Sequence, residues 1–135
     1  MRILILDDSK SRLVLFRKKL IGSIVTCVEH VSDCIWEIES NEPFDYIFLD
    51  HDLDYRIYVP SGPGTGYEVA QWLRRHPEKM PGKVILHTCN EKAGPLMLEE
   101  LPGASFLPGL FLVDFGISDL ENIDIIYKKY VENFK

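Results

Sequence analysis

Short apolar runs alternate with longer amphipathic segments along this chain, and polar residues follow most of these runs directly. The run from Ile3 to Leu6 ends at a pair of aspartates, and the run 46–49 ends at Asp50. Continuous apolar runs of this length predict the strands of a sheet whose two faces are both covered. Five such strands are predicted, within residues 2–10, 23–31, 45–50, 83–87 and 105–115.

The first segment between strands has the spacing of an amphipathic helix, since Leu13, Phe16 and Leu20 share one face. Ser9 stands at the position expected for its N-cap, because a serine hydroxyl can accept a hydrogen bond from an unpaired backbone N–H. Gly22 marks the end of the segment. A helix between Ser9 and Gly22 is therefore predicted.

The second predicted helix is capped by Ser32 or Asp33 and continues through Glu39. Its expected apolar contacts are Ile35, Trp36 and Ile38. Further helices are predicted over residues 66–76, 91–101 and 118–134, each with apolar residues at a helical interval. Pro95 in the fourth helix is tolerated best in the first turn, where its missing N–H costs least.

Strand and helix thus alternate five times, with no internal repeat and no linker. This order predicts right-handed crossovers and a parallel sheet with helices on both faces. We therefore expect one domain over residues 1–135, a three-layer (βα)5 α/β fold of the flavodoxin-like type with a central five-stranded sheet.

Composition narrows the classes of function. The formal net charge of −6 argues against non-specific nucleic-acid binding, which needs clustered Lys and Arg, but it does not exclude a small anionic ligand held through a cation. The sequence contains no signal peptide or membrane segment. Three cysteines without paired metal-site spacing favour a reducing cytoplasm over secretion.

The candidate chemistry lies at the strand ends, because functional groups of an open parallel sheet gather beyond the carboxyl ends of its strands. The polar groups there are Asp7-Asp8 after the first strand, Asp50-His51-Asp52 after the third and His87-Thr88-Cys89-Asn90 after the fourth. Crowded carboxylates repel one another, and a hard divalent cation would relieve this repulsion. We expect Asp7, Asp8 and Asp50 to hold Mg²⁺ or Mn²⁺, and the two histidines favour Mn²⁺ slightly.

An acidic pair ending strand one, an Asp ending strand three and a glycine opening helix three make the chain similar to the response-regulator receiver domain. By this resemblance Asp7 and Asp8 match the metal-binding acids, Asp50 matches the phospho-acceptor, and Gly66 occupies the glycine position of "GTGYEVAQWLRRH". The similarity covers nearly the whole chain.

The chain also departs from ordinary receivers. Strand four ends in His87 with Thr88 one place later than the receiver hydroxyl residue, and "FLVDFGIS" contains no Lys. The combination "LDHDL" with "HTCNEKAG" resembles instead the cyclic-phosphate processing receiver domains, a divergent branch with Asp-His-Asp and His-x-x-Asn strand endings. This resemblance implies a metal-dependent site acting on a cyclic or terminal phosphate.

A mechanism can be written from these residues. The cation would polarise a phosphoryl oxygen, and His51 or His87 would act as general base or acid. Asp52 would complete the metal shell or orient a histidine. The remaining ligand contacts are expected from Asn90, Thr88 and Arg56, the last suited to bidentate phosphate binding.

Two other functions remain open. The chain can be a non-catalytic signalling module, phosphorylated on Asp50 or binding a protein partner as a pseudo-receiver, since it carries no output domain. It can also be a degenerate relative with neither metal nor activity. The catalytic alternative expects a small phosphorylated ligand, a nucleotide or an RNA end.

Overall fold

The computed structural model describes residues 1–53, 59–88, 90, 92–107, 116–126 and 128. Its strands are β1 (Arg2–Leu6), β2 (Ile24–Val28), β3 (Tyr46–Leu49), β4 (Lys83–Leu86) and β5 (Ser105–Phe106). The α-helices are α1 (Lys10–Lys19), α2 (Val31–Ser40), α3 (Gly66–Arg75) and α4 (Ala93–Glu100), with short 3₁₀ helices η1 (Pro77–Lys79) and η3 (Ile117–Asn122).

All five strands are parallel and form one sheet in the order β2-β1-β3-β4-β5. The strands in the middle are the continuous apolar runs of the sequence, and their residues are almost completely buried. The predicted fold class, a flavodoxin-like domain with a five-stranded parallel sheet, is confirmed.

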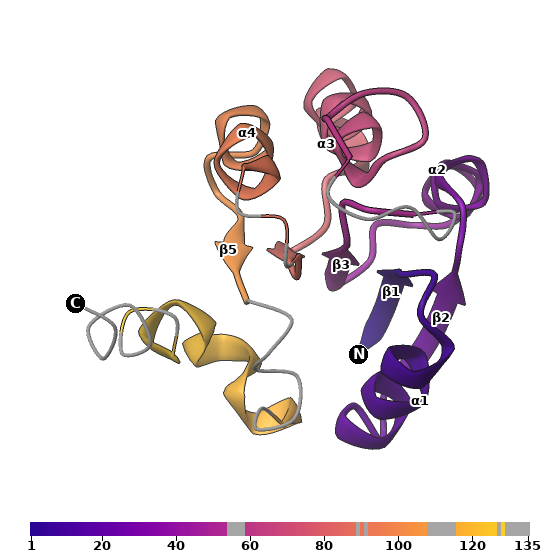
Figure 1. The fold of residues 1–135 in the computed structure, drawn as a ribbon. Helices are drawn as coiled ribbons and strands as arrows, with labels where there is room; N and C mark the ends of the chain where they lie inside the picture. The colour runs from indigo at the N-terminus through magenta and orange to yellow at the C-terminus, as the bar shows by residue number, and fades with distance from the viewer. Residues whose placement is uncertain (54–58, 89, 91, 108–115, 127, 129–135) are drawn as a thin grey trace.

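The helices form two layers, one on each face of the sheet (Figure 1). Helices α2, α3 and α4 cover one face, where Cys34, Leu73 and Met97 pack on side chains of β1, β3 and β4. On the other face α1 contributes Phe16 and Leu20, and the segment after β5 contributes its own apolar residues. Alternate residues of the same strand pack against the two helix layers, because successive side chains of a strand point to opposite faces of the sheet.

Helix α1 follows its prediction closely. It begins after Ser9, whose hydroxyl accepts a hydrogen bond from the backbone N–H of Arg12 at 3.3 Å. Phe16 and Leu20 are buried and Leu13 is partly buried. In α4, Pro95 is the third residue and so lies in the first turn, as expected.

Helix α2 corrects two predictions. It begins at Val31 with His30 as N-cap, rather than after Ser32 or Asp33. Its buried face consists of Val31, Cys34 and Ile38, so Trp36, about 200° around the helix from Cys34, is 62% exposed. The expectation that Trp36 is an apolar contact of this helix is therefore wrong.

The last third of the chain is described in part. The predicted fifth strand (105–115) is observed as β5 over its first two residues, and residues 108–115 lie outside the described part. The predicted final helix begins as the 3₁₀ helix η3, with Leu120 and Ile123 buried against the α1 layer. No helix of the described residues combines the length and apolar character needed to span a membrane.

Candidate metal and phosphate site

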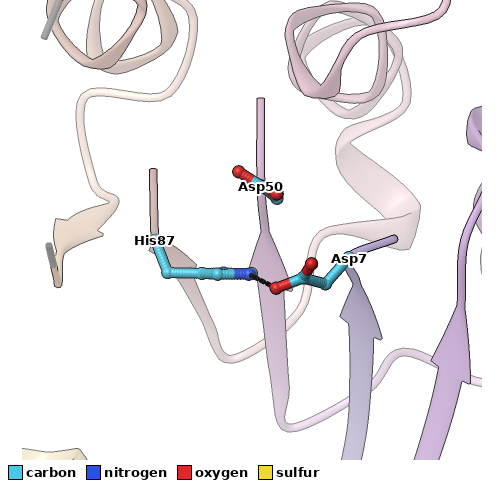
Figure 2. Close-up of side chains that lie close together, drawn as sticks. All are labelled: Asp7, Asp50 and His87. Carbon is cyan, nitrogen blue, oxygen red and sulfur yellow. Dashed lines mark hydrogen bonds and ion pairs between the residues drawn. The ribbon is translucent and has the colours of Figure 1, made fainter. Parts of the chain in front are cut away.

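Three predicted side chains meet because their strands are neighbours in register. Leu6 pairs with Leu49 and Leu49 pairs with Leu86, so the residues that follow, Asp7, Asp50 and His87, stand side by side (Figure 2). The backbone ladder continues into them, since Asp50 N–H donates to the carbonyl of Leu6 and His87 N–H to that of Leu49, both at 3.0 Å. Their placement therefore follows from the sheet itself.

The carboxylate of Asp7 is fully buried and receives four hydrogen bonds. Arg12 donates from Nε to Oδ2 at 2.7 Å and from Nη2 to Oδ1 at 2.9 Å. The backbone N–H of Ser9 donates to Oδ1 at 2.8 Å, and His87 Nε2 lies 3.1 Å from Oδ2. Burial would raise the pKa of Asp7, but the hydrogen bonds from His87 and Arg12 outweigh it and hold the pKa well below its ordinary value.

Asp50 is almost as buried but has fewer donors. The N–H of His51 donates to its Oδ1 at 2.8 Å, and Arg12 Nη2 donates to its Oδ2 at 3.1 Å. Burial, reinforced by the charge of Asp7 and opposed by His87 and Arg12, raises the pKa of Asp50 to about 7. Two neighbouring acids therefore differ in charge state near neutral pH.

The imidazole of His87 packs against two aromatic rings. Its ring stands edge-on to Phe16 at a centroid distance of 5.0 Å and lies 6.1 Å from the ring of Phe48. Nε2 faces Asp7, and because an ionised carboxylate only accepts, Nε2 carries the proton in this contact. Nδ1 is buried and makes no hydrogen bond with the described residues, so it is available to hold the proton if Nε2 gives it up.

The three side chains fit a divalent cation. Among the described residues, Asp7, Asp50 and His87 each offer a ligand atom, and these atoms lie within 4.8 Å of one another. Carboxylate oxygens are the ligands that Mg²⁺ and Mn²⁺ prefer, and the imidazole would add a nitrogen donor. The guanidinium of Arg12 already places a positive charge against both carboxylates.

Asp8, the other predicted metal ligand, is half-buried and is not part of this group. Its neighbour Asp7, rather than Asp8, faces Asp50 and His87, because successive residues of an extended chain point to opposite sides.

A second network adjoins the first. His51 is fully buried, with Nδ1 2.7 Å from Asp52 Oδ1 and Nε2 3.0 Å from Ser61 Oγ. Since Asp52 accepts, Nδ1 carries the proton, and in the neutral ring Nε2 accepts from the Ser61 hydroxyl. The N–H of His51 bonds Asp50, so the two networks share one stretch of backbone.

Asn90 connects this network to α4. Its Nδ2 donates to Asp52 Oδ1 and to the carbonyl of Val59, both at 3.1 Å. Its Oδ1 accepts from the N–H groups of Lys92 and Ala93, at 3.2 Å each. Asn90 thus ties the loop after β3 to the start of α4.

The other residues predicted at the site are Thr88, Arg56 and Cys89. Thr88 is buried, and its hydroxyl accepts from the backbone N–H of Asn90 at 3.0 Å. Arg56, predicted to bind phosphate, and Cys89 lie outside the described residues.

Two residues at the site were not predicted, Arg12 and Ser61. Arg12 is the third residue of α1. The only indication of its role in the sequence is that this positively charged residue follows shortly after the Asp7-Asp8 pair. Ser61 gives no signal, because it lies ten positions after His51 in the sequence and no periodicity relates the two residues.

Solved structures share this fold. A CheY-like receiver domain from Methanospirillum hungatei is 23% identical, with a TM-score of 0.65, covering 97% of this chain and 94% of that chain. The Mn²⁺-bound response regulator Rcp1 is 19% identical, with a TM-score of 0.62 and coverage of 97% and 94%. The response regulator TrrA from Thermotoga maritima, solved with Mg²⁺-BeF, is 21% identical, with a TM-score of 0.62 and coverage of 94% and 96%.

Comparison of the sequence with known families identifies the relationship more narrowly than the solved structures do. No curated protein matches the chain significantly. The model of the cyclic-phosphate processing receiver domain, however, matches residues 2–102 and so includes every described residue of both networks. The chain belongs to the family of cyclic-phosphate processing receiver domains.

Proposed function

We propose that this chain is a metal-dependent phosphoesterase that hydrolyses a cyclic or terminal phosphate, on a nucleotide or an RNA end. The observation that carries the proposal is the buried group of Asp7, Asp50 and His87 at the carboxyl ends of three adjacent strands. The family match supports the substrate class.

The cation, Mg²⁺ or Mn²⁺, would be held by Asp7, Asp50 and His87. When bound, it supplies a Lewis acid that polarises a phosphoryl oxygen and lowers the pKa of a bound water. The protein itself supplies a buried site from which bulk water is largely excluded, because the side chains of Asp7, Asp50 and His87 are at most 6% exposed. Electrostatic interactions are stronger in such a site than at the surface.

His51 is the side chain we assign to proton transfer. Asp52 holds its Nδ1–H at 2.7 Å, which leaves Nε2 as the nitrogen that can take a proton. The hydroxyl of Ser61 occupies this position, so a substrate or water would have to replace it. Asn90 and Asp52 are positioning residues in this scheme, because they orient the ring and the loop.

Thr88 and Arg56 remain the proposed ligand contacts. The proposed ligand is small and phosphorylated, and the proposed compartment is a reducing cytoplasm, where Cys27 and Cys34 would stay as free thiols.

The test is hydrolysis by the purified protein of nucleotides and short RNAs that carry cyclic or terminal phosphates. We expect turnover with Mn²⁺ or Mg²⁺, none with EDTA, and a loss of at least a hundredfold in Asp50→Asn. Asp33→Asn is the matched control, because Asp33 is an exposed carboxylate on α2. Activity that survives in Asp50→Asn contradicts the assignment.

A signalling role is the second candidate, because Asp50 ends β3 at the place of the receiver phospho-acceptor and the fold is that of receiver domains. In that case acetyl phosphate should label the wild-type protein and not Asp50→Asn. Absence of labelling by any small phosphodonor counts against phosphotransfer, and a protein partner would then be sought for the unmodified domain.

A further inference from the structure

Arg12 acts as an internal cation of the site. Its guanidinium contacts both acids, with two hydrogen bonds to Asp7 and one to Asp50. Its side chain is 36% exposed, whereas those of Asp7 and Asp50 are 0% and 6% exposed. The charge that balances the buried carboxylates therefore comes from the edge of the site.

Asp7 has no acceptor capacity left. A carboxylate oxygen offers two lone-pair directions, and each oxygen of Asp7 accepts two hydrogen bonds at 2.7–3.1 Å. Among the described residues, Asp50 accepts from His51 N–H and Arg12. Arg12 Nη2 donates both to Oδ1 of Asp7 and to Oδ2 of Asp50, so it lies between the two carboxylates that a shared cation would have to contact.

The donors of Asp7 differ in how easily they can leave. The N–H of Ser9 is fixed by the turn that caps α1, and His87 would itself be a ligand of the cation in the proposed site. Arg12 is half-exposed and reaches the site on a flexible stem, so its guanidinium can rotate outward without opening the core.

A displaced Arg12 stays at the same rim, since it belongs to the first turn of α1. Its planar fork would then be within reach of an anion at this rim, such as the phosphate group of the proposed ligand. Arginine suits this contact because two parallel N–H groups match two phosphate oxygens.

We propose that Arg12 and the divalent cation alternate on Asp7 and Asp50, and that the displaced guanidinium binds the phosphate group of the ligand. Arg12 thus binds the two carboxylates when the cation is absent and the phosphate group of the ligand when the cation is bound. This inference rests on the proposed function, because it takes the same three side chains as the cation site.

The experiment measures Mn²⁺ affinity by isothermal titration calorimetry for the wild type, Arg12→Met and Arg17→Met. Arg17 lies on the same helix and is exposed, so its substitution removes the same charge away from the site. We expect Arg12→Met to bind Mn²⁺ at least tenfold more tightly than the wild type, and Arg17→Met to stay within twofold. Inorganic phosphate is then titrated into the Mn²⁺-saturated proteins, where Arg12→Met should bind at least tenfold more weakly.

Circular dichroism confirms that each variant is folded, and Arg12→Gln replaces Arg12→Met if the latter is not. Unchanged or weaker Mn²⁺ binding in the Arg12 variant overturns the inference while leaving the cation site intact. Unchanged phosphate affinity overturns the role of Arg12 in ligand binding. Absence of Mn²⁺ binding in both wild type and variant contradicts the proposed function as well.

Discussion

The backbone of Gly66 lies directly against the carbonyl group of Asp50. A Cβ at this position would overlap the carbonyl oxygen and would lie 2.8 Å from the carbonyl carbon, closer than real side chains approach. The N–H of Gly66 donates to the carbonyl of His51 at 3.0 Å. The first residue of α3 thus holds the end of β3, and with it two residues of the site, in place.

Gly66→Ala should therefore destabilise the protein by about 1–3 kcal/mol, the usual cost of overpacking. Urea denaturation measures the change in the free energy of unfolding. Gly62→Ala is the control, because a Cβ on Gly62 meets nothing within 4 Å. Equal stability of the two variants would show that the close contact between Gly66 and Asp50 does not constrain the fold.

The pH dependence of stability should report on Asp50. With its pKa raised from 3.8 to about 7, mainly by burial, the folded protein keeps a proton that the unfolded chain has already lost. The contribution of Asp50 therefore falls as the pH rises through this window, by up to about 1.4 kcal/mol per unit. Asp7, with a lowered pKa, loses its contribution only as the pH falls below 3.8.

Denaturation of the wild type and Asp50→Asn in EDTA, between pH 5 and pH 8, checks this effect. All other ionisable groups are the same in both proteins, so the difference between the two curves isolates Asp50. Asp50→Asn should gain stability relative to the wild type as the pH rises. Parallel curves would mean that the folded and unfolded states bind the Asp50 proton equally.

Ser61→Ala should lower stability by about 1–3 kcal/mol, because it leaves the buried Nε2 of His51 without a donor. Ser32, an exposed residue of α2, supplies the control Ser32→Ala. Urea denaturation distinguishes the two. If Ser61→Ala costs no more than Ser32→Ala, water or another group replaces the hydroxyl, and the loop does not depend on this contact.

The fold could be predicted because its strands are continuous apolar runs that need both faces covered, and their order leaves few topologies. The group of Asp7, Asp50 and His87 was foreseeable for the same reason, since parallel strands in register bring the following residues together. Which member of the Asp7-Asp8 pair joins this group was not foreseeable, because it depends on the face of the sheet to which each side chain points.

Arg12, Ser61 and Trp36 show where sequence reasoning ends. The contacts of Arg12 with Asp7 and Asp50 follow from the side chain's direction out of the first helical turn. The contact of Ser61 with His51 joins residues ten positions apart that no periodicity relates. Trp36 is apolar but lies off the buried face of α2, which Val31, Cys34 and Ile38 form.

The most direct test of the cation site is a crystal of the wild-type protein soaked in Mn²⁺ and a nucleotide cyclic phosphate, with data collected at the manganese edge. We predict one strong anomalous peak bound by Asp7, Asp50 and His87, with the ligand's phosphate beside it. A peak held by other residues, or no peak among these three, would contradict the account.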